Sequence, residues 1–235
     1  MTQLSKLIAC AADDMTKYQE LLVRDPGHAR VSLAGVNHAL VPTDVLAHDL
    51  PEELVEILGA EIAPTVMHIL GRLIGTKHAR AFFAACEIGT DELYHRVLTG
   101  PIHAAWVGYG DVNLLVWEPH FDENFLVLWE SRNSFCAQEA INAGLRKRAC
   151  NLLAGYAAGW CSEATGLPIE VVEVACRAET ISTCRFVMAH ADSVSRRISE
   201  PRLHRPSGQY RSTTACTPAQ FRLCPSWVSE SSRNN

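Results

Sequence analysis

Apolar residues recur with helical spacing through the first third of the chain. Leu4, Leu7 and Ile8 fall on one helical face, and a turn is expected at Asp25-Pro26-Gly27. A longer helical series follows Pro51 and is interrupted by Pro64, which should kink or divide it. The apolar positions of this series are Leu54, Ile57, Leu58, Ile62, Val66, Ile69, Leu70 and Leu73. Another helix is expected over about Thr76–Cys86.

The pattern becomes strand-like after residue 101. Runs rich in β-branched and aromatic residues, separated by turn residues, predict strands at Ile102–Tyr109, Val112–Glu118 and Asn124–Trp129. Because helices precede these antiparallel strands and a helix and hairpin follow them, we predict an α+β fold. In this fold an antiparallel sheet packs against helices.

The pattern returns to helix from about Cys136 to Thr165, a segment dense in Ala and Gly. Gly155 and Gly159 lie four residues apart within it, which would allow close packing against a sheet. A β-hairpin is then expected from the strands Ile169–Ala175 and Thr183–Ala189.

Three parts are expected along the chain; the bounds of the middle part follow from the resemblance described below, and the last part is set apart by its charge. Residues 1–34 form an N-terminal helical or irregular segment, residues 35–190 a folded domain, and residues 191–235 a flexible tail. The tail has seven Arg, no Lys and three acidic residues, is rich in Ser, Thr and Pro, and has no helical or alternating period. The net charge of the whole chain is −5, so we expect no nucleic-acid partner beyond weak contacts by the tail.

Composition and cysteine content indicate the cellular compartment in which the protein is expected. Hydrophobic residues make up 48% of the chain, which is enough for a sizeable core. The start has no sustained apolar segment of a secretory signal, and no stretch approaches the roughly 18 apolar residues of a membrane span. Nine cysteines, an odd number, argue against a disulfide scaffold. We therefore expect a cytoplasmic protein with no membrane partner.

Four residues form a candidate metal site. Cys150 lies in the Ala-rich helix, and Glu173, Cys176 and Cys184 lie in the hairpin that follows. Three thiolates and a carboxylate suit a closed, tetrahedral and hence structural Zn²⁺ site. The alternative is that the cysteines are ordinary buried thiols. Because a regular strand would direct Glu173 and Cys176 to opposite faces, the site requires a bulge or a strand end near Val174-Ala175.

The same segments resemble a known family. Cys150-Asn-Leu-Leu-Ala-Gly-Tyr-Ala-Ala-Gly159 is similar to the C-x(4)-G-Y-x-x-G helix of the 4-vinyl-reductase-type domain. Glu173-x-x-Cys176-Arg177 and Cys184-Arg185-Phe186 resemble its hairpin. This domain is the sensory head of phenol- and xylene-responsive activators of aromatic catabolism. It also occurs in bacteriochlorophyll-biosynthesis proteins and is related to transport-particle subunits.

The resemblance covers about residues 35–190 and implies a ligand set. In the phenol sensors, the residues that match Cys150, Glu173, Cys176 and Cys184 bind structural zinc, with the same 22, 2 and 7 intervening residues as here. This chain departs from the family between the hairpin cysteines, where Ala178–Thr183 replaces the usual Gly-Asp turn. No ATPase module or helix-turn-helix follows, so the sensors' transcriptional output is not carried over.

The resemblance also implies a ligand pocket. In the sensors, a His and a Trp hold the phenol hydroxyl; the His matches His103, whereas the Trp position falls at Ser131. Trp129 lies two residues earlier, one strand period away, so it could face the same side of the sheet as Ser131. The candidate pocket residues are His103, Trp106, Tyr109, Trp129, Phe135 and Tyr156. The alternative is that these aromatic residues simply fill the core.

Three functions follow from these observations. The first is a ligand-binding sensory or regulatory domain with a structural zinc, a small aromatic ligand and a homodimeric state. The second is a vinyl-reductase-like enzyme or a pigment-biosynthesis accessory protein, although the sequence has no phosphate-binding glycine loop and no catalytic residues that we can assign. The third is a dimerising scaffold related to transport-particle subunits.

Overall fold

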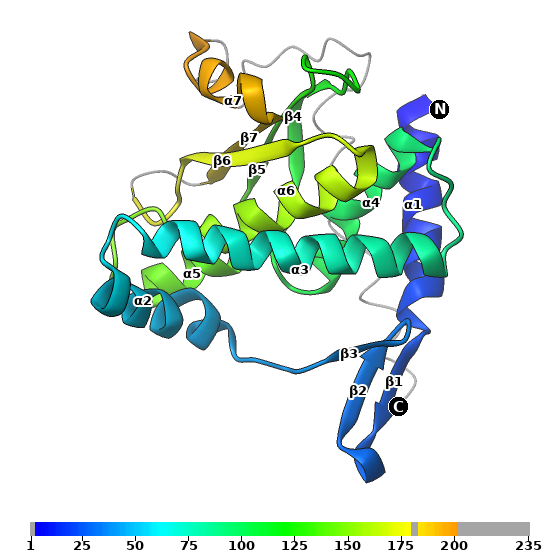
Figure 1. The fold of residues 1–235 in the computed structure, drawn as a ribbon, viewed down its shortest axis with the longest axis horizontal. Coiled ribbons are helices and arrows are strands. Elements are labelled where there is room, and N and C mark those ends of the chain that lie inside the picture. Colours follow the sequence, from blue (N-terminus) through cyan, green and yellow to red (C-terminus); the bar gives the residue numbers. More distant parts are fainter. Residues whose placement is uncertain (1–2, 180–182, 202–235) are drawn as a thin grey trace.

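A computed structural model describes residues 3–179 and 183–201 of the chain (Figure 1). Its helices are α1 Gln3–Gln19, α2 Leu50–Leu58, α3 Ala63–Ala85, α4 Leu93–Trp106, α5 Phe135–Asn142, α6 Asn151–Thr165 and α7 Ala191–Ile198. Its strands are β1 Leu22–Asp25, β2 Arg30–Leu33, β3 Val36–His38, β4 Asn113–Glu118, β5 Leu126–Ser131, β6 Ile169–Ala175 and β7 Cys184–His190. The predicted α+β fold with antiparallel sheets against helices is confirmed.

The larger sheet has the strand order β4-β5-β7-β6, and every neighbouring pair is antiparallel. The predicted hairpin is the β6–β7 pair. Successive residues of the central strands point to opposite faces of the sheet and belong to two different apolar clusters. Trp129 and Phe186 belong to the main core with α4 and α6, whereas Leu128 and Val187 pack with Val194 of α7. The sheet is therefore covered by helices on both faces, and no described helix is long and apolar enough to cross a bilayer.

Helices α3 and α6 lie side by side (Figure 1), and their backbones approach each other very closely. A Cβ atom added at Gly155 would lie 2.0 Å from the carbonyl oxygen of His68, and one at Gly75 would lie 2.1 Å from that of Tyr156. Gly71 and Gly159 are equally close to the opposite helix. The expected close packing at Gly155 and Gly159 is present, but its partner is α3 rather than the sheet.

The prediction of a strand at Ile102–Tyr109 is wrong, because α4 extends to Trp106 with Pro101 inside it. The Trp160 ring packs against Gly100, where a Cβ would lie 2.7 Å from it. The indole nitrogen of Trp160 and the hydroxyl of Thr99 both donate to the carbonyl of Arg96. These side-chain donors and the packing of Trp160 stabilise a helix that an internal proline would otherwise disrupt.

Two expected helices have different limits in the structure. Pro64 divides the first series, as predicted, because α2 ends at Leu58 and Pro64 lies in the first turn of α3. The segment Thr76–Cys86 is not a separate helix but the second half of α3. The expected helix over Cys136–Thr165 is two helices, because Gly144 takes a left-handed backbone with φ of 73° just after α5.

The two ends of the described chain also differ from the prediction. Residues 22–38, which the sequence left irregular apart from a turn, form the small antiparallel sheet β1-β2-β3. Residues 191–198, assigned to the flexible tail, form α7. Val194 and Ile198, one turn apart, cover the outer sheet face, and the ring of His190 accepts a hydrogen bond from the amide of Asp192. Residues 202–235 of the expected tail lie outside the described residues.

Candidate functional site

The structure brings the four predicted metal ligands together. Cys150 precedes the first residue of α6, Glu173 lies near the end of β6, Cys176 directly follows β6, and Cys184 begins β7. One ligand atom from each residue lies within 4.8 Å of all the others, and all four residues are buried. This Cys₃Glu cluster joins a helix and both strands of the hairpin.

The spacing within the Cys₃Glu cluster fits a metal ion. The sulfur of Cys184 lies 3.6 Å from that of Cys150 and 4.0 Å from that of Cys176. Two thiolates on one tetrahedral Zn²⁺ are about 3.8 Å apart, since each Zn–S bond is about 2.3 Å. Glu173 accepts a hydrogen bond from the Cys150 amide through Oε2, but its buried Oε1 has no partner. A free carboxylate oxygen beside three thiols is a donor set that could hold a metal ion.

A bulge in β6 makes this arrangement possible. Glu173 pairs with Phe186 and Ala175 with Arg185, so β6 advances by two residues where β7 advances by one. The strand ends at Ala175, and Cys176 lies beyond it. The irregularity therefore occurs where the sequence required one.

The electrostatics of the Cys₃Glu cluster also favour a cation. Burial, followed by the charge of Cys176, raises the pKa of Glu173 to about 8, and burial raises the pKa of Cys150 well above its ordinary value. Without a counter-ion, Glu173 and Cys150 resist ionisation in their dry surroundings, whereas hydrogen bonds with Cys150 and Cys184 lower the pKa of Cys176. A divalent cation would reverse this preference, because metal-bound thiols are deprotonated. The amide of Arg177 donates to the Cys184 sulfur and would support a thiolate there.

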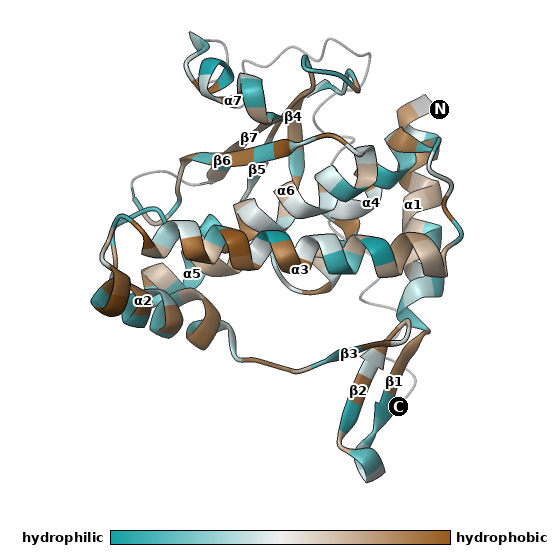
Figure 2. Ribbon diagram, viewed as in Figure 1, coloured by the Kyte–Doolittle hydropathy of each residue, from teal (hydrophilic) through white to brown (hydrophobic). Residues whose placement is uncertain are grey.

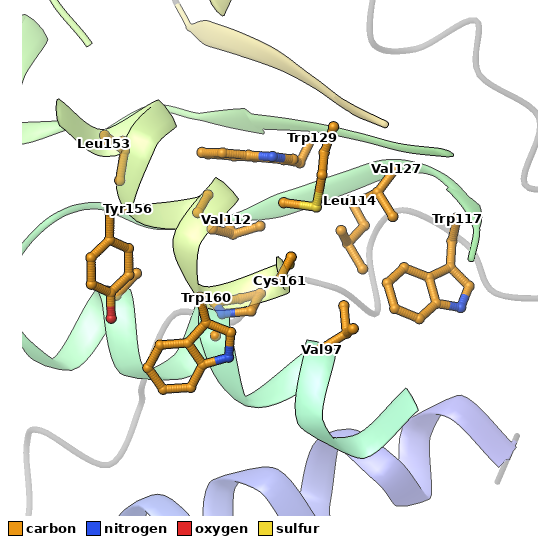
Figure 3. Close-up of a pocket in the computed structure, with 15 residues that line it drawn as sticks. Val97, Val112, Leu114, Trp117, Val127, Trp129, Leu153, Tyr156, Trp160 and Cys161 are labelled. Atoms are coloured by element: carbon orange, nitrogen blue, oxygen red, sulfur yellow. The ribbon is translucent and has the colours of Figure 1, made fainter. Parts of the chain in front are cut away.

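A second candidate site is an apolar cavity between the sheet and helices α4 and α6 (Figure 3). It is a small cavity, with about 40 Å³ of space for the centre of a water-sized molecule, and it is partly open to solvent. Its walls include Leu114, Trp117, Trp129, Tyr156, Trp160, Cys161 and Met188. Nearly all of the lining atoms are apolar.

Trp129 provides an exception to this apolar lining. Its ring stacks on Phe186 with centroids 4.0 Å apart, and it is 3% exposed. Its indole N–H is buried and has no hydrogen-bond partner. An unpaired buried donor is costly, so this nitrogen is a natural anchor for an acceptor atom of a bound molecule.

The other predicted pocket residues have different positions. Tyr156 lines the cavity, but His103, Trp106 and Phe135 are outside its lining. His103 lies on α4 rather than on a strand, fully buried, and its Nδ1 is 2.7 Å from the hydroxyl of Tyr156. The Trp106 ring lies 5.9 Å from that of His103, and Phe135 stacks on Tyr109 at 5.2 Å. Their role in ligand binding stays a prediction.

Sequence reasoning missed two groups. Trp160 and Cys161 also line the cavity; burial raises the pKa of Cys161 to about 12, as expected of an unreactive thiol. Tyr18 and His78 meet His103 from α1 and α3, with ring centroids 5.7 and 5.0 Å from it. In the sequence, only the four-residue spacing of His78 and Phe82 could have indicated that His78 faces the core. No pattern of neighbouring residues connects Tyr18 with His103.

Comparison with known proteins supports the fold. The sequence matches no known family profile and no curated protein. Among solved structures, the chain is similar to the phenol-responsive sensory domain of the transcription activator PoxR, crystallised with phenol. The TM-score is 0.70 at 20% sequence identity, over 83% of this chain and 97% of that one. Membership of the 4-vinyl-reductase-type family stays a prediction, and what the comparison shows is that the chain shares the fold of this PoxR domain.

Proposed function

We propose that this chain is a ligand-binding sensory or regulatory domain for a small, neutral aromatic molecule. The observation that carries the proposal is the apolar cavity with the buried, unpaired N–H of Trp129 in its wall. An aromatic ring would replace empty space with apolar contacts, and an oxygen on that ring would accept the unused hydrogen bond.

The ligand is expected to be neutral. No Asp, Glu, Lys or Arg is among the cavity-lining residues within the described chain. Moving a carboxylate or ammonium group into such surroundings without a partner would cost more than its contacts return. The bound phenol of the similar PoxR domain is a small aromatic molecule of this kind and supports the proposal.

A thermal-shift titration with phenol tests this function. A ligand at 100 times its Kd should stabilise the domain by about 2.7 kcal/mol, and the shift should grow with concentration. Benzoate is the matched charged probe and should give no comparable shift. The proposal is wrong if a panel of phenol, simple alkylbenzenes and larger neutral aromatics leaves the melting temperature unchanged.

We also propose that the Cys₃Glu cluster holds a structural Zn²⁺. The mixed sulfur and oxygen donors, the sulfur separations and the free Oε1 of Glu173 support this ion. Four protein ligands would leave no open position, so the ion would contribute stability by tying the start of α6 to the β6–β7 hairpin.

A third proposal concerns self-association. Ile69 and Leu73 on one side of α3, and Ile62 directly before it, are each more than half exposed, and Figure 2 shows brown, hydrophobic segments on α2 and on parts of α3. In an antiparallel pair of α3 helices centred on Ile69, Glu61 in the turn before α3 would lie near the partner subunit's Lys77, because each lies eight residues from Ile69. Such a self-complementary surface fits a two-fold homodimer.

A further inference from the structure

A second pocket lies beneath α2, and we call it the α2 pocket. It is bounded by α2, the start of α3, α5 and residues 145–149 before α6, which meet at the end of the molecule that carries α2 (Figure 1). It offers about 180 Å³ of space for the centre of a water-sized molecule, against about 40 Å³ in the cavity of Trp129. No described residue lines both spaces, so each can take its own occupant.

The walls of the α2 pocket are aliphatic. Leu46, Val55, Met67 and Leu152 line it with several Ala and Pro residues, and its described lining includes no aromatic ring. A flexible alkyl chain can follow such walls, whereas a flat ring would find no other ring to stack on. Although α2 contains five apolar residues besides its proline, none of its nine residues is buried, so this helix covers the pocket without packing tightly on the core.

An ion pair stands at the edge of the α2 pocket. Lys147, before α6, pairs with Glu52 of α2, and both residues line the pocket. Their side chains are 48% and 40% exposed, so the pair contributes little stability and either partner can be replaced by another group. A carboxylate entering the pocket could take the place of Glu52 on Lys147, while Glu52 turns to the solvent.

Two further donors line the α2 pocket close to Lys147. Arg148 donates from Nε to Glu179 and from Nη1 to the carbonyl of Glu173, which leaves its Nη2 without a partner in the described chain. The side-chain amide of Asn151 also makes no hydrogen bond within the described residues. The polar groups of the pocket are therefore mainly donors, and a carboxylate, which only accepts, is the group that matches them.

We propose that the α2 pocket is a second binding site, for a short aliphatic monocarboxylate. Lys147, Arg148 and Asn151 hold the carboxylate of this molecule, and its alkyl chain lies under α2 against the aliphatic walls. The site stands apart from the cavity proposed for an aromatic molecule, so it does not depend on that proposal.

Three probes with the same alkyl chain test the charge preference on the full chain. Near pH 7, calorimetry should give hexanoate an affinity roughly tenfold or more above that of 1-hexanol, because a charged acceptor makes the stronger hydrogen bonds. Hexylamine, which is a cation at this pH, should not bind beside Lys147 and Arg148. Saturating phenol should leave the affinity for hexanoate within about twofold, because the two sites share no described lining residue.

Three results with the wild type would overturn the second site. The first is no binding of hexanoate at millimolar concentrations, and the second is equal binding of hexanoate and 1-hexanol. The third is competition between hexanoate and phenol, which would place hexanoate in the cavity of Trp129. Failure of phenol to bind would instead contradict only the proposed function.

The two members of the ion pair give opposite expectations. Lys147→Gln removes a donor and should weaken hexanoate by roughly tenfold, whereas Glu52→Gln removes the competing carboxylate and should strengthen it a few fold. Both positions are well exposed, so both variants should fold. Lys17→Gln, which breaks an exposed pair with Asp14 outside the pocket, should leave the affinity within about twofold. A change in the same direction for Lys147→Gln and Glu52→Gln would mean that the pair is only structural, and would overturn the proposal.

Discussion

Glu173 and Cys176 present their ligand atoms within 4.8 Å of each other although they are three residues apart on the path of one strand. The bulge between Glu173 and Ala175 and the end of β6 at Ala175 reverse the alternation that a regular strand would impose. Two side chains that a flat strand would direct to opposite faces therefore lie together in one buried site.

The first prediction concerns Cys184. Replacing it with Ser should release the metal and lower the melting temperature sharply, because metal binding and folding are coupled. Metal analysis after extensive dialysis should find about one zinc per wild-type chain and much less in the variant. The control is the exposed Cys10→Ser, which should change stability by no more than about 0.5 kcal/mol. Metal-free wild-type protein of unchanged stability would contradict the zinc proposal.

Trp129→Phe should weaken phenol binding by roughly tenfold, since it removes a donor but keeps an aromatic ring against Phe186. Trp117→Phe is a matched control, because Trp117 also lines the cavity but is not among the residues with a buried unpaired nitrogen. Calorimetry measures both. Similar losses in the two variants would indicate that only cavity shape matters, and not the Trp129 N–H.

Gly155→Ala should destabilise the domain by about 3 kcal/mol or more, because the new methyl group would overlap the carbonyl of His68 and force α3 and α6 apart. Chemical denaturation measures the loss. Gly27→Ala, where the nearest atom to an added Cβ is 3.5 Å away, should be close to neutral. A stable Gly155→Ala domain would show that the helices can separate without cost.

Acid should destabilise the domain partly through His78. Its pKa falls from about 6.5 in the unfolded chain to about 4 in the folded one, so the unfolded chain binds more protons between these values. This contribution is present above pH 6.5 and is lost as the pH falls towards 4, by at most about 3 kcal/mol. Denaturation at a series of pH values should give a shallower slope in this window for His78→Phe than for the wild type. An identical slope would mean that His78 does not titrate as proposed.

Ile69→Glu should separate the proposed dimer, because it places like charges opposite each other at the two-fold axis. Sedimentation should detect a monomer for this variant and a dimer for the wild type. Thr16→Glu, at an exposed polar position of α1 outside this surface, tests whether added charge alone is enough. A monomeric wild type at all accessible concentrations would rule out the α3 surface as a dimer contact.

The sequence predicted the Cys₃Glu cluster well because its residues lie in two local elements, a helix and a hairpin, whose spacing fixes their approach. It failed at α4, where the run after Pro101 resembles a strand and the helix is stabilised by Trp160, 59 residues away. The cavity was only partly predictable for the same reason. Trp129 and Tyr156 were identified, but the position of His103 behind Tyr156 depends on α4 being a helix.

The glycine contacts between α3 and α6 also limit how the domain can move. Because four glycines bring the two backbones into direct contact, no side chains at these contacts can rearrange. We therefore expect α3 and α6 to move together as one rigid unit. A molecule entering the cavity presses on α6 from the opposite side. Any expansion must therefore be taken up by α4 and the sheet, and we expect these elements, rather than the α3–α6 pair, to move when a ligand binds.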